Sequence, residues 1–251
     1  STSNTSVTFN NCKFVDNNKN TNTNALTIKS TSSTAAVFTT VNFSGCEFVC
    51  NQKDNSGGSV MITGRTISTA TPTTVNFTNG VFANSKATST AGKGGALFIG
   101  NNSKVTINGT YFLNNICQTT GASAANDGGG AISIVSDNTG LIAWARTDVS
   151  ITNALFYGNS VTGTAAGGAI ALIGASGHTN TNRPKLTITN TIFEKNKSTS
   201  SGGAIYTSYG ELNISNSTFK RDTAITGGAI AINQSTSIFT LANDSFINNN
   251  A

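Results

Sequence analysis

The chain has 251 residues, of which 37% are hydrophobic and only 10% are charged, and its formal net charge is +5. Its polar residues are mainly 40 Thr, 34 Asn and 28 Ser, whereas charged residues supply about a quarter of an average soluble domain. The basic residues are scattered and no apolar stretch is long enough to cross a membrane. The composition therefore argues against nucleic acid as a partner and against direct membrane insertion, and it favours an extracellular or cell-surface protein.

Eight copies of one ungapped block organise the chain. Each block begins with alternating apolar and polar residues and ends with Phe. The first copy is 7–14, and the others, in chain order, are 41–48, 75–82, 105–112, 149–156, 186–193, 212–219 and 239–246. Alternation with a period of two predicts a β-strand with one buried face.

The fifth residue of every block is Asn or Gly, the two residue types that best tolerate a positive φ. We therefore expect a left-handed corner in each repeat, at Asn11, Gly45, Asn79, Gly109, Asn153, Asn190, Asn216 and Asn243. This column could also be a ladder that binds sugars. The backbone role is favoured because Gly, which has no side chain, occupies two of the eight positions.

A Gly-Gly pair followed by a small and an apolar residue marks another strand in six repeats. These segments are 57–60, 94–97, 129–132, 167–170, 202–205 and 227–230, and the first repeat has Asn24-Ala25-Leu26 instead. One repeat cannot bury its own apolar face, so successive copies are expected to stack with parallel strand pairing. The sequence thus predicts an all-β, right-handed parallel β-helix of about eight coils. We expect 1–251 to be one segment of a longer repeat protein, because no capping element precedes the first block or follows the last.

Gly-Gly-Ala-Ile combined with Phe-x-x-Asn resembles the repeat of the polymorphic outer membrane proteins (Pmp), known from chlamydial autotransporter adhesins and related adhesin-like surface proteins. The Phe and Asn positions match in Phe14–Asn17, Phe48–Asn51, Phe112–Asn115, Phe156–Asn159, Phe193–Asn196 and Phe246–Asn249. Ser85 and Asp222 depart from the pattern. The resemblance implies a surface-displayed autotransporter passenger that mediates cell adhesion, with no catalytic residues to transfer.

Three functions follow as hypotheses. The favoured one is an adhesin or surface-display segment whose partner is a host or neighbouring cell-surface protein or glycan, or a sister molecule. The alternative is a structural subunit of an extracellular filament or sheath. The third, which we disfavour, is a polysaccharide-active β-helix enzyme.

The enzyme hypothesis depends on paired carboxylates, and only ten acidic residues are present. Asp148 and Glu211 each precede a block and would lie about 9.6 Å apart, two coils along the same column. Lys185 precedes the block between them and would keep both ionised, whereas a general acid needs a raised pKa. We therefore expect no enzyme, no catalytic residue and no cofactor. Lys104, Asp148, Lys185 and Glu211 should instead form an exposed ladder of alternating charge.

Cys12 and Cys46 occupy the same position in the first two blocks. Adjacent coils would place their Cα atoms close enough for a disulfide, yet inward-facing free cysteines also behave as small apolar residues. Both interpretations stay open, with the core role favoured. No His or carboxylate shares this position, so no metal site is expected.

Long loops precede several blocks, and two of them, 135–148 and 173–185, come from adjacent repeats. Together they hold Trp144, Arg146, His178 and Arg183, which include the only Trp and the only His of the chain. Trp and Arg are enriched at interface hot spots, so these four residues are the candidate partner-binding site. Packing of the loops over the neighbouring coil is the alternative, and it is favoured.

Overall fold

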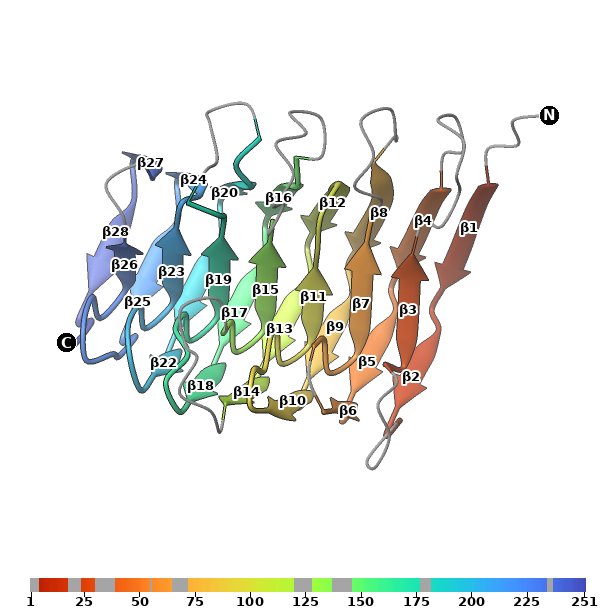
Figure 1. The fold of residues 1–251 in the computed structure, drawn as a ribbon, viewed down its shortest axis with the longest axis horizontal. Coiled ribbons are helices and arrows are strands. Elements are labelled where there is room, and N and C mark those ends of the chain that lie inside the picture. Colours follow the sequence, from red (N-terminus) through yellow and green to blue (C-terminus); the bar gives the residue numbers. More distant parts are fainter. Residues whose placement is uncertain are drawn as a thin grey trace.

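The structure, a computed structural model, describes residues 5–17, 24–29, 39–54, 56–64, 72–119, 128–136, 146–176, 182–233 and 237–251. The described part contains strands and no helix. Its strands wind round one rod and form four sheets in which all neighbours are parallel (Figure 1). The predicted all-β parallel β-helix of about eight coils is confirmed.

The first two sheets have eight strands each and are built from the two halves of the repeated block. The first sheet contains β1 (Thr5–Asn10), β4 (Thr39–Ser44), β8 (Thr73–Thr78), β12 (Ser103–Asn108), β16 (Asp148–Thr152), β20 (Lys185–Thr189), β24 (Glu211–Ser215) and β27 (Ile238–Ala242). The second sheet contains β2 (Lys13–Val15), β5 (Glu47–Val49), β9 (Val81–Ala83), β13 (Tyr111–Leu113), β17 (Leu155–Tyr157), β21 (Ile192–Glu194), β25 (Thr218–Lys220) and β28 (Ser245–Ile247).

The third and fourth sheets have five and seven strands and complete most of the coils. The third sheet was not predicted, because its strands share no residue type from coil to coil; it contains β6 (Gln52–Lys53), β10 (Lys86–Ser89), β14 (Ile116–Thr119), β18 (Ser160–Thr162) and β22 (Lys197–Ser198). The fourth sheet is the predicted Gly-Gly strand; it contains β3 (Leu26–Lys29), β7 (Val60–Thr63), β11 (Leu97–Ile99), β15 (Ile132–Val135), β19 (Ile170–Ile173), β23 (Ile205–Ser208) and β26 (Ile230–Asn233).

Equivalent residues of successive blocks face one another in register, as with Val105 and Val149 or Phe112 and Phe156. The Phe that ends each block points inward, and successive rings stack almost parallel with centroids 4.5 to 5.0 Å apart. The six rings from Phe48 to Phe219 are fully buried. Apolar burial of this kind is the main favourable term in folding, so the Phe column forms the centre of the core.

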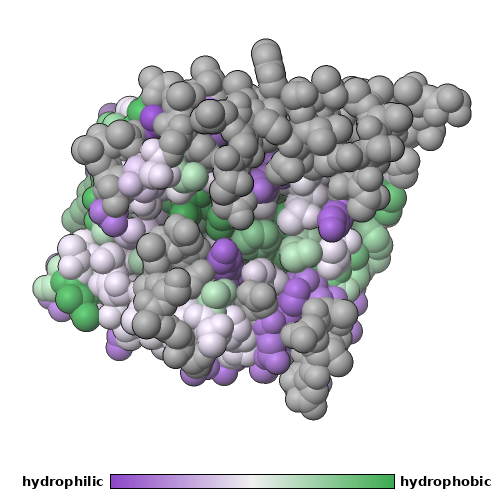
Figure 2. Space-filling model, in the orientation of Figure 1, coloured by the Kyte–Doolittle hydropathy of each residue, from purple (hydrophilic) through white to green (hydrophobic). Residues whose placement is uncertain are grey.

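The coils at the two ends of the rod pair on one side only. Apolar residues are consequently exposed there, and Figure 2 shows apolar surface at both ends of the rod. The exposed residues of these coils are Val7, Val15, Ile232, Leu241, Phe246 and Ile247.

All eight predicted corner residues have a positive φ, between 50° and 61°. A second column of positive φ follows two residues after each Phe, at Asp16, Cys50, Asn84, Asn114, Gly158, Lys195, Arg221 and Asn248. Sequence reasoning missed this second corner because charged residues and Cys occupy half of it. The Gly-Gly pairs have a steric cause: Gly94 has a φ of +65°, and a Cβ on Gly95 would lie 2.0 Å from the carbonyl oxygen of Gly130 in the next coil.

The Asn of Phe-x-x-Asn lies inside the rod. Asn159 is completely buried, and its Oδ1 accepts hydrogen bonds from the backbone N–H and the side-chain Nδ2 of Asn115, both at 3.0 Å. Its Nδ2 donates to the Phe112 carbonyl and to Asn196 Oδ1. Asn159 thus satisfies buried backbone groups of the preceding coil, as buried polar groups require.

The two cysteines of the shared column are free thiols. Cys46 is buried, with 1% of its surface exposed, and its Sγ lies 3.4 Å from the Phe9 carbonyl oxygen. Burial raises the pKa of the Cys46 thiol. Cys12 packs against the same core, so both residues act here as small core side chains.

Candidate functional site

The predicted charge column is present at the edge where the first sheet begins. Strand pairing places Lys104 beside Asp148, Asp148 beside Lys185, and Lys185 beside Glu211. All four side chains therefore lie in one column across β12, β16, β20 and β24, which confirms the alignment of the coils. The column is less exposed than predicted, because the side chains of Lys185 and Glu211 are only 35% and 15% accessible.

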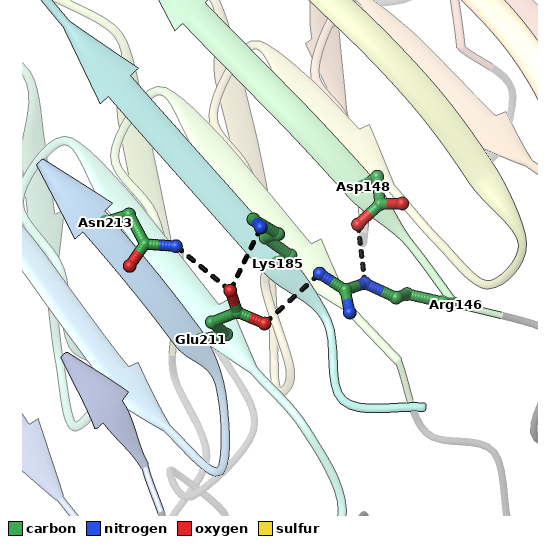
Figure 3. A network of polar contacts seen from close by, with 5 residues as sticks. All are labelled: Arg146, Asp148, Lys185, Glu211 and Asn213. Atoms are coloured by element: carbon green, nitrogen blue, oxygen red, sulfur yellow. Dashed lines mark hydrogen bonds and ion pairs between the residues drawn. The ribbon is translucent and has the colours of Figure 1, made fainter. Parts of the chain in front are cut away.

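Arg146 adds a link that was not predicted (Figure 3). Its Nε donates to Asp148 Oδ1 at 2.6 Å, and its Nη2 donates to Glu211 Oε2 at 3.2 Å, so one guanidinium joins carboxylates from two different coils. Lys185 Nζ lies 3.0 Å from Glu211 Oε1, which also accepts a hydrogen bond from Asn213 Nδ2. The sequence contained a signal for this network, because Arg146 and Asp148 are two residues apart and side chains at that spacing in an extended chain point the same way.

Glu211 is the least exposed acidic group of the network, with 15% of its side chain accessible. Its partial burial opposes ionisation. Hydrogen bonds from Lys185 and Asn213 and the charges of Arg146 and Lys185 outweigh that effect and lower the pKa of Glu211 below its ordinary value. A carboxyl group held in its ionised form accepts hydrogen bonds and does not supply a proton at neutral pH. The network is therefore suited to ion pairing.

A shallow pocket of about 300 Å³ opens beside this network on the outer face of the first sheet. Its lining residues are Lys104, Val105, Thr106, Arg146, Asp148, Val149, Ser150, Lys185 and Thr187. Lys104 is exposed and makes no ion pair with any described residue. The lining thus combines ammonium, guanidinium, carboxylate and hydroxyl groups, a set suited to recognition by ion pairs and hydrogen bonds. Sequence reasoning did not single out Thr106, Ser150 and Thr187 as site residues, although they occupy equivalent outward positions in three successive blocks.

The four predicted partner-binding residues have different positions. Arg146 lines the pocket with 24% of its side chain exposed. Arg183 is 4% exposed and belongs to the packed part of its loop. Trp144 and His178 lie outside the described residues. The structure thus brings Arg146, but not Arg183, to the pocket.

The described part of the chain has neither a cluster of metal-binding side chains nor a membrane-spanning helix. No group of three or more His, Cys, Asp or Glu side chains there is arranged to hold a metal ion. Within the same residues, no helix has the length and apolar character needed to span a membrane.

One known protein family matches a segment of the chain. The family described as the Chlamydia polymorphic membrane protein repeat matches residues 190–208. This segment contains one copy of both motifs: Phe193 and Asn196, then Gly202 to Ile205. The chain therefore carries a repeat of the Pmp type at this position, in agreement with the resemblance seen in its sequence. Neither the curated proteins nor the solved structures gave a match.

Proposed function

We propose that this chain is an extracellular, surface-displayed β-helical segment that mediates adhesion to a protein or glycan on a host or neighbouring cell. The observation that carries the proposal is the Pmp-type repeat at 190–208, set within an uninterrupted stack of equivalent coils. The matching family is that of a polymorphic membrane protein repeat from Chlamydia. A regular rod offers a rigid support from which loops and side chains can contact a partner.

The pocket at Arg146 is the contact site that we propose for a partner. Asp148 and Glu211 hold the guanidinium through Nε and Nη2, while Nη1 has no hydrogen-bond partner among the described residues. An arginine fixed in this way has already lost much of its rotamer entropy, so less is lost when a ligand binds. The exposed Lys104 adds a second donor at the rim of the same pocket.

The experiment compares binding of the purified chain to cells with that of an Arg146→Ala variant and an Arg221→Ala control. Arg221 also pairs with a carboxylate, that of Glu194, but it lies away from the pocket. We expect Arg146→Ala to weaken binding about tenfold with a small change in thermal stability, and Arg221→Ala to leave binding unchanged. Addition of Trp144→Ala tests the adjoining loop in the same way.

Two results would count against the proposal. One is a loss of stability in Arg146→Ala with unchanged binding per folded molecule, which would make Arg146 a packing residue only. The other is regular coil-to-coil assembly of the purified chain in electron micrographs with no binding to cells, which would favour a filament or sheath subunit. A reducing-sugar assay on polysaccharides, in which we expect no activity, tests the enzyme alternative.

A further inference from the structure

An apolar stripe crosses the outer face of the second sheet. Its members are the first residues of four successive strands of that sheet, and they follow one another in register: Val81, Tyr111, Leu155 and Ile192. Tyr111 and Ile192 are 49% and 47% exposed. The same column has charged or hydroxyl residues in the other four coils, namely Lys13, Glu47, Thr218 and Ser245. Apolar residues in adjacent rows of an exposed face indicate a contact surface.

A groove of about 470 Å³ lies between this stripe and the corner column. Tyr111, Leu155 and Ile192 line it from the stripe, and Asn153, Asn190 and Asn216 line it from the corner, with Ala154, Thr191 and Thr218 completing the lining. The groove spans four coils and shares no lining residue with the pocket at Arg146.

The corner amides are fixed and keep unused hydrogen-bonding capacity. Asn190 Nδ2 donates to Asn153 Oδ1 at 2.6 Å, and Asn153 Nδ2 donates to Asn108 Oδ1 at 3.1 Å. A primary amide has two N–H donors and two acceptor lone pairs, so the ladder leaves an N–H of Asn153 and a lone pair of its Oδ1 for a ligand. The side chains of Asn153 and Asn190 are exposed.

The lining of the groove disfavours a charged ligand. None of the described residues that line the groove is acidic or basic. A charged ligand would lose hydration there without gaining a counter-ion, which is unfavourable. Apolar surface beside amide and hydroxyl groups fits an uncharged ligand that carries many hydroxyls.

The coil spacing indicates the kind of chain that fits. The stacked rings of Phe112, Phe156 and Phe193, which belong to the strands that line the groove, are 4.7 and 4.8 Å apart. An extended polypeptide advances about 3.3 Å per residue, so the spacing of its side chains does not match the spacing of the coils. A pyranose unit in an extended sugar chain is longer than one residue of an extended polypeptide, and its advance is nearer to the coil spacing. The two central coils would therefore each offer one apolar residue and one amide to one sugar, Leu155 with Asn153 and Ile192 with Asn190. The first coil adds Tyr111, and the last adds Asn216 and Thr218.

We propose that this groove binds an uncharged glycan chain that lies parallel to the rod axis. Sugar C–H groups pack on Tyr111, Leu155 and Ile192, and hydroxyls exchange hydrogen bonds with Asn153, Asn190 and Asn216. The site goes beyond the proposed adhesion through Arg146, because it lies elsewhere on the rod and is tested without cells.

The test is isothermal titration of the whole chain with neutral oligosaccharides, from disaccharide to hexasaccharide, of the β-1,4-linked glucose and N-acetylglucosamine series. We expect affinity to rise up to the tetrasaccharide and then to level off, because four coils line the groove. The double variant Tyr111→Ser/Ile192→Thr should bind the tetrasaccharide at least about tenfold more weakly. Tyr157→Ser is the matched control, because Tyr157 is an outward aromatic residue of the same sheet that does not line the groove.

The substitutions are chosen to preserve folding, since Ser245 and Thr218 already occupy the same column. Asn190→Gly provides a second route: Gly45 and Gly109 show that the corner accepts Gly, and we expect the lost amide to weaken binding. The proposal is overturned if no neutral oligosaccharide binds at millimolar concentration, if the groove variants bind as well as the parent chain, or if only acidic sugars or peptides bind.

Discussion

Two columns of asparagine run along this rod, and they serve opposite purposes. The inner column, represented by Asn159, is fully buried and makes four side-chain hydrogen bonds. The corner column, represented by Asn153, is exposed and has a φ of 54°. Where the inner column departs from Asn it has the polar residues Ser85 and Asp222, whereas the corner column changes to Gly. One column requires the side chain, and the other requires the backbone conformation.

The largest effect is expected from Asn159→Leu, which keeps the branched shape of the side chain and removes all four hydrogen bonds. The backbone N–H and the Nδ2 of Asn115 and the carbonyl of Phe112 would lose the partner that Asn159 supplies. Each buried unsatisfied group costs about 1 to 3 kcal/mol, so we expect the free energy of unfolding to fall by about 5 kcal/mol. Urea unfolding followed by circular dichroism measures it. A loss below about 1 kcal/mol would show that water replaces the amide.

Asp222 occupies a position of the inner column at which the native residue is not Asn. Its Oδ1 accepts hydrogen bonds from the backbone N–H and the Nδ2 of Asn196, while its Oδ2 is buried and has no partner among the described residues. In the preceding coil the equivalent atom, Asn196 Nδ2, donates to the Phe156 carbonyl. Burial, with a smaller contribution from the charge of Glu194, raises the pKa of Asp222 to about 7 against opposing hydrogen bonds from Asn196 and Lys220.

Asp222→Asn should therefore stabilise the chain at neutral and alkaline pH. The folded state binds the Asp222 proton more tightly than the unfolded state, so the parent chain should lose stability as pH rises from about 4 to about 7. At about 1.4 kcal/mol per pKa unit, the variant should gain up to about 4 kcal/mol above pH 7 and almost nothing below pH 4. Unfolding midpoints between these limits, with exposed Asp54→Asn as the control, measure the slope. An unchanged slope in Asp222→Asn would contradict this account.

The corner column should give the smallest effects. Asn153→Ala places a residue with a Cβ at a φ of 54° without the local hydrogen bonding of Asn, so we expect a loss of about 1 kcal/mol. Asn153→Gly keeps the left-handed backbone accessible and should change stability by less than about 0.5 kcal/mol. Thermal unfolding of both variants makes the comparison. Equal and large losses for Gly and Ala would show that the exposed amide ladder, which both variants lack, matters more than the backbone angle.

Most structural features that recur from coil to coil could be predicted from the sequence. Strand alternation, the Asn or Gly corner and the Phe column could all be predicted because each coil meets the same local and stacking constraints. The third sheet could not be predicted, since a pair such as Gln52–Lys53 is too short to show a period. The second corner also escaped notice, because stacking holds Lys195 and Arg221 at positive φ, which their residue types do not favour.

The candidate sites could likewise be predicted where they lie in the repeated blocks, and not where they lie in the loops. The column of Lys104, Asp148, Lys185 and Glu211 followed from alignment of the blocks, and the apolar stripe through Tyr111 carries the same kind of signal in the residue before each Phe. The loops do not repeat, so the sequence could favour packing of the two loops but could not show that Arg183 would be the arginine that is buried.

By itself, then, the sequence determined the coil, its register and which side chains point inward, because a period of two and a stacked repeat leave few alternatives. Only the tertiary structure decided that Arg146 would join Asp148 to Glu211 across two coils. Only the tertiary structure, likewise, placed the corner amides beside the apolar stripe to form a groove. Both depend on how a corner or loop folds against its neighbours, and that geometry is set by contacts between coils.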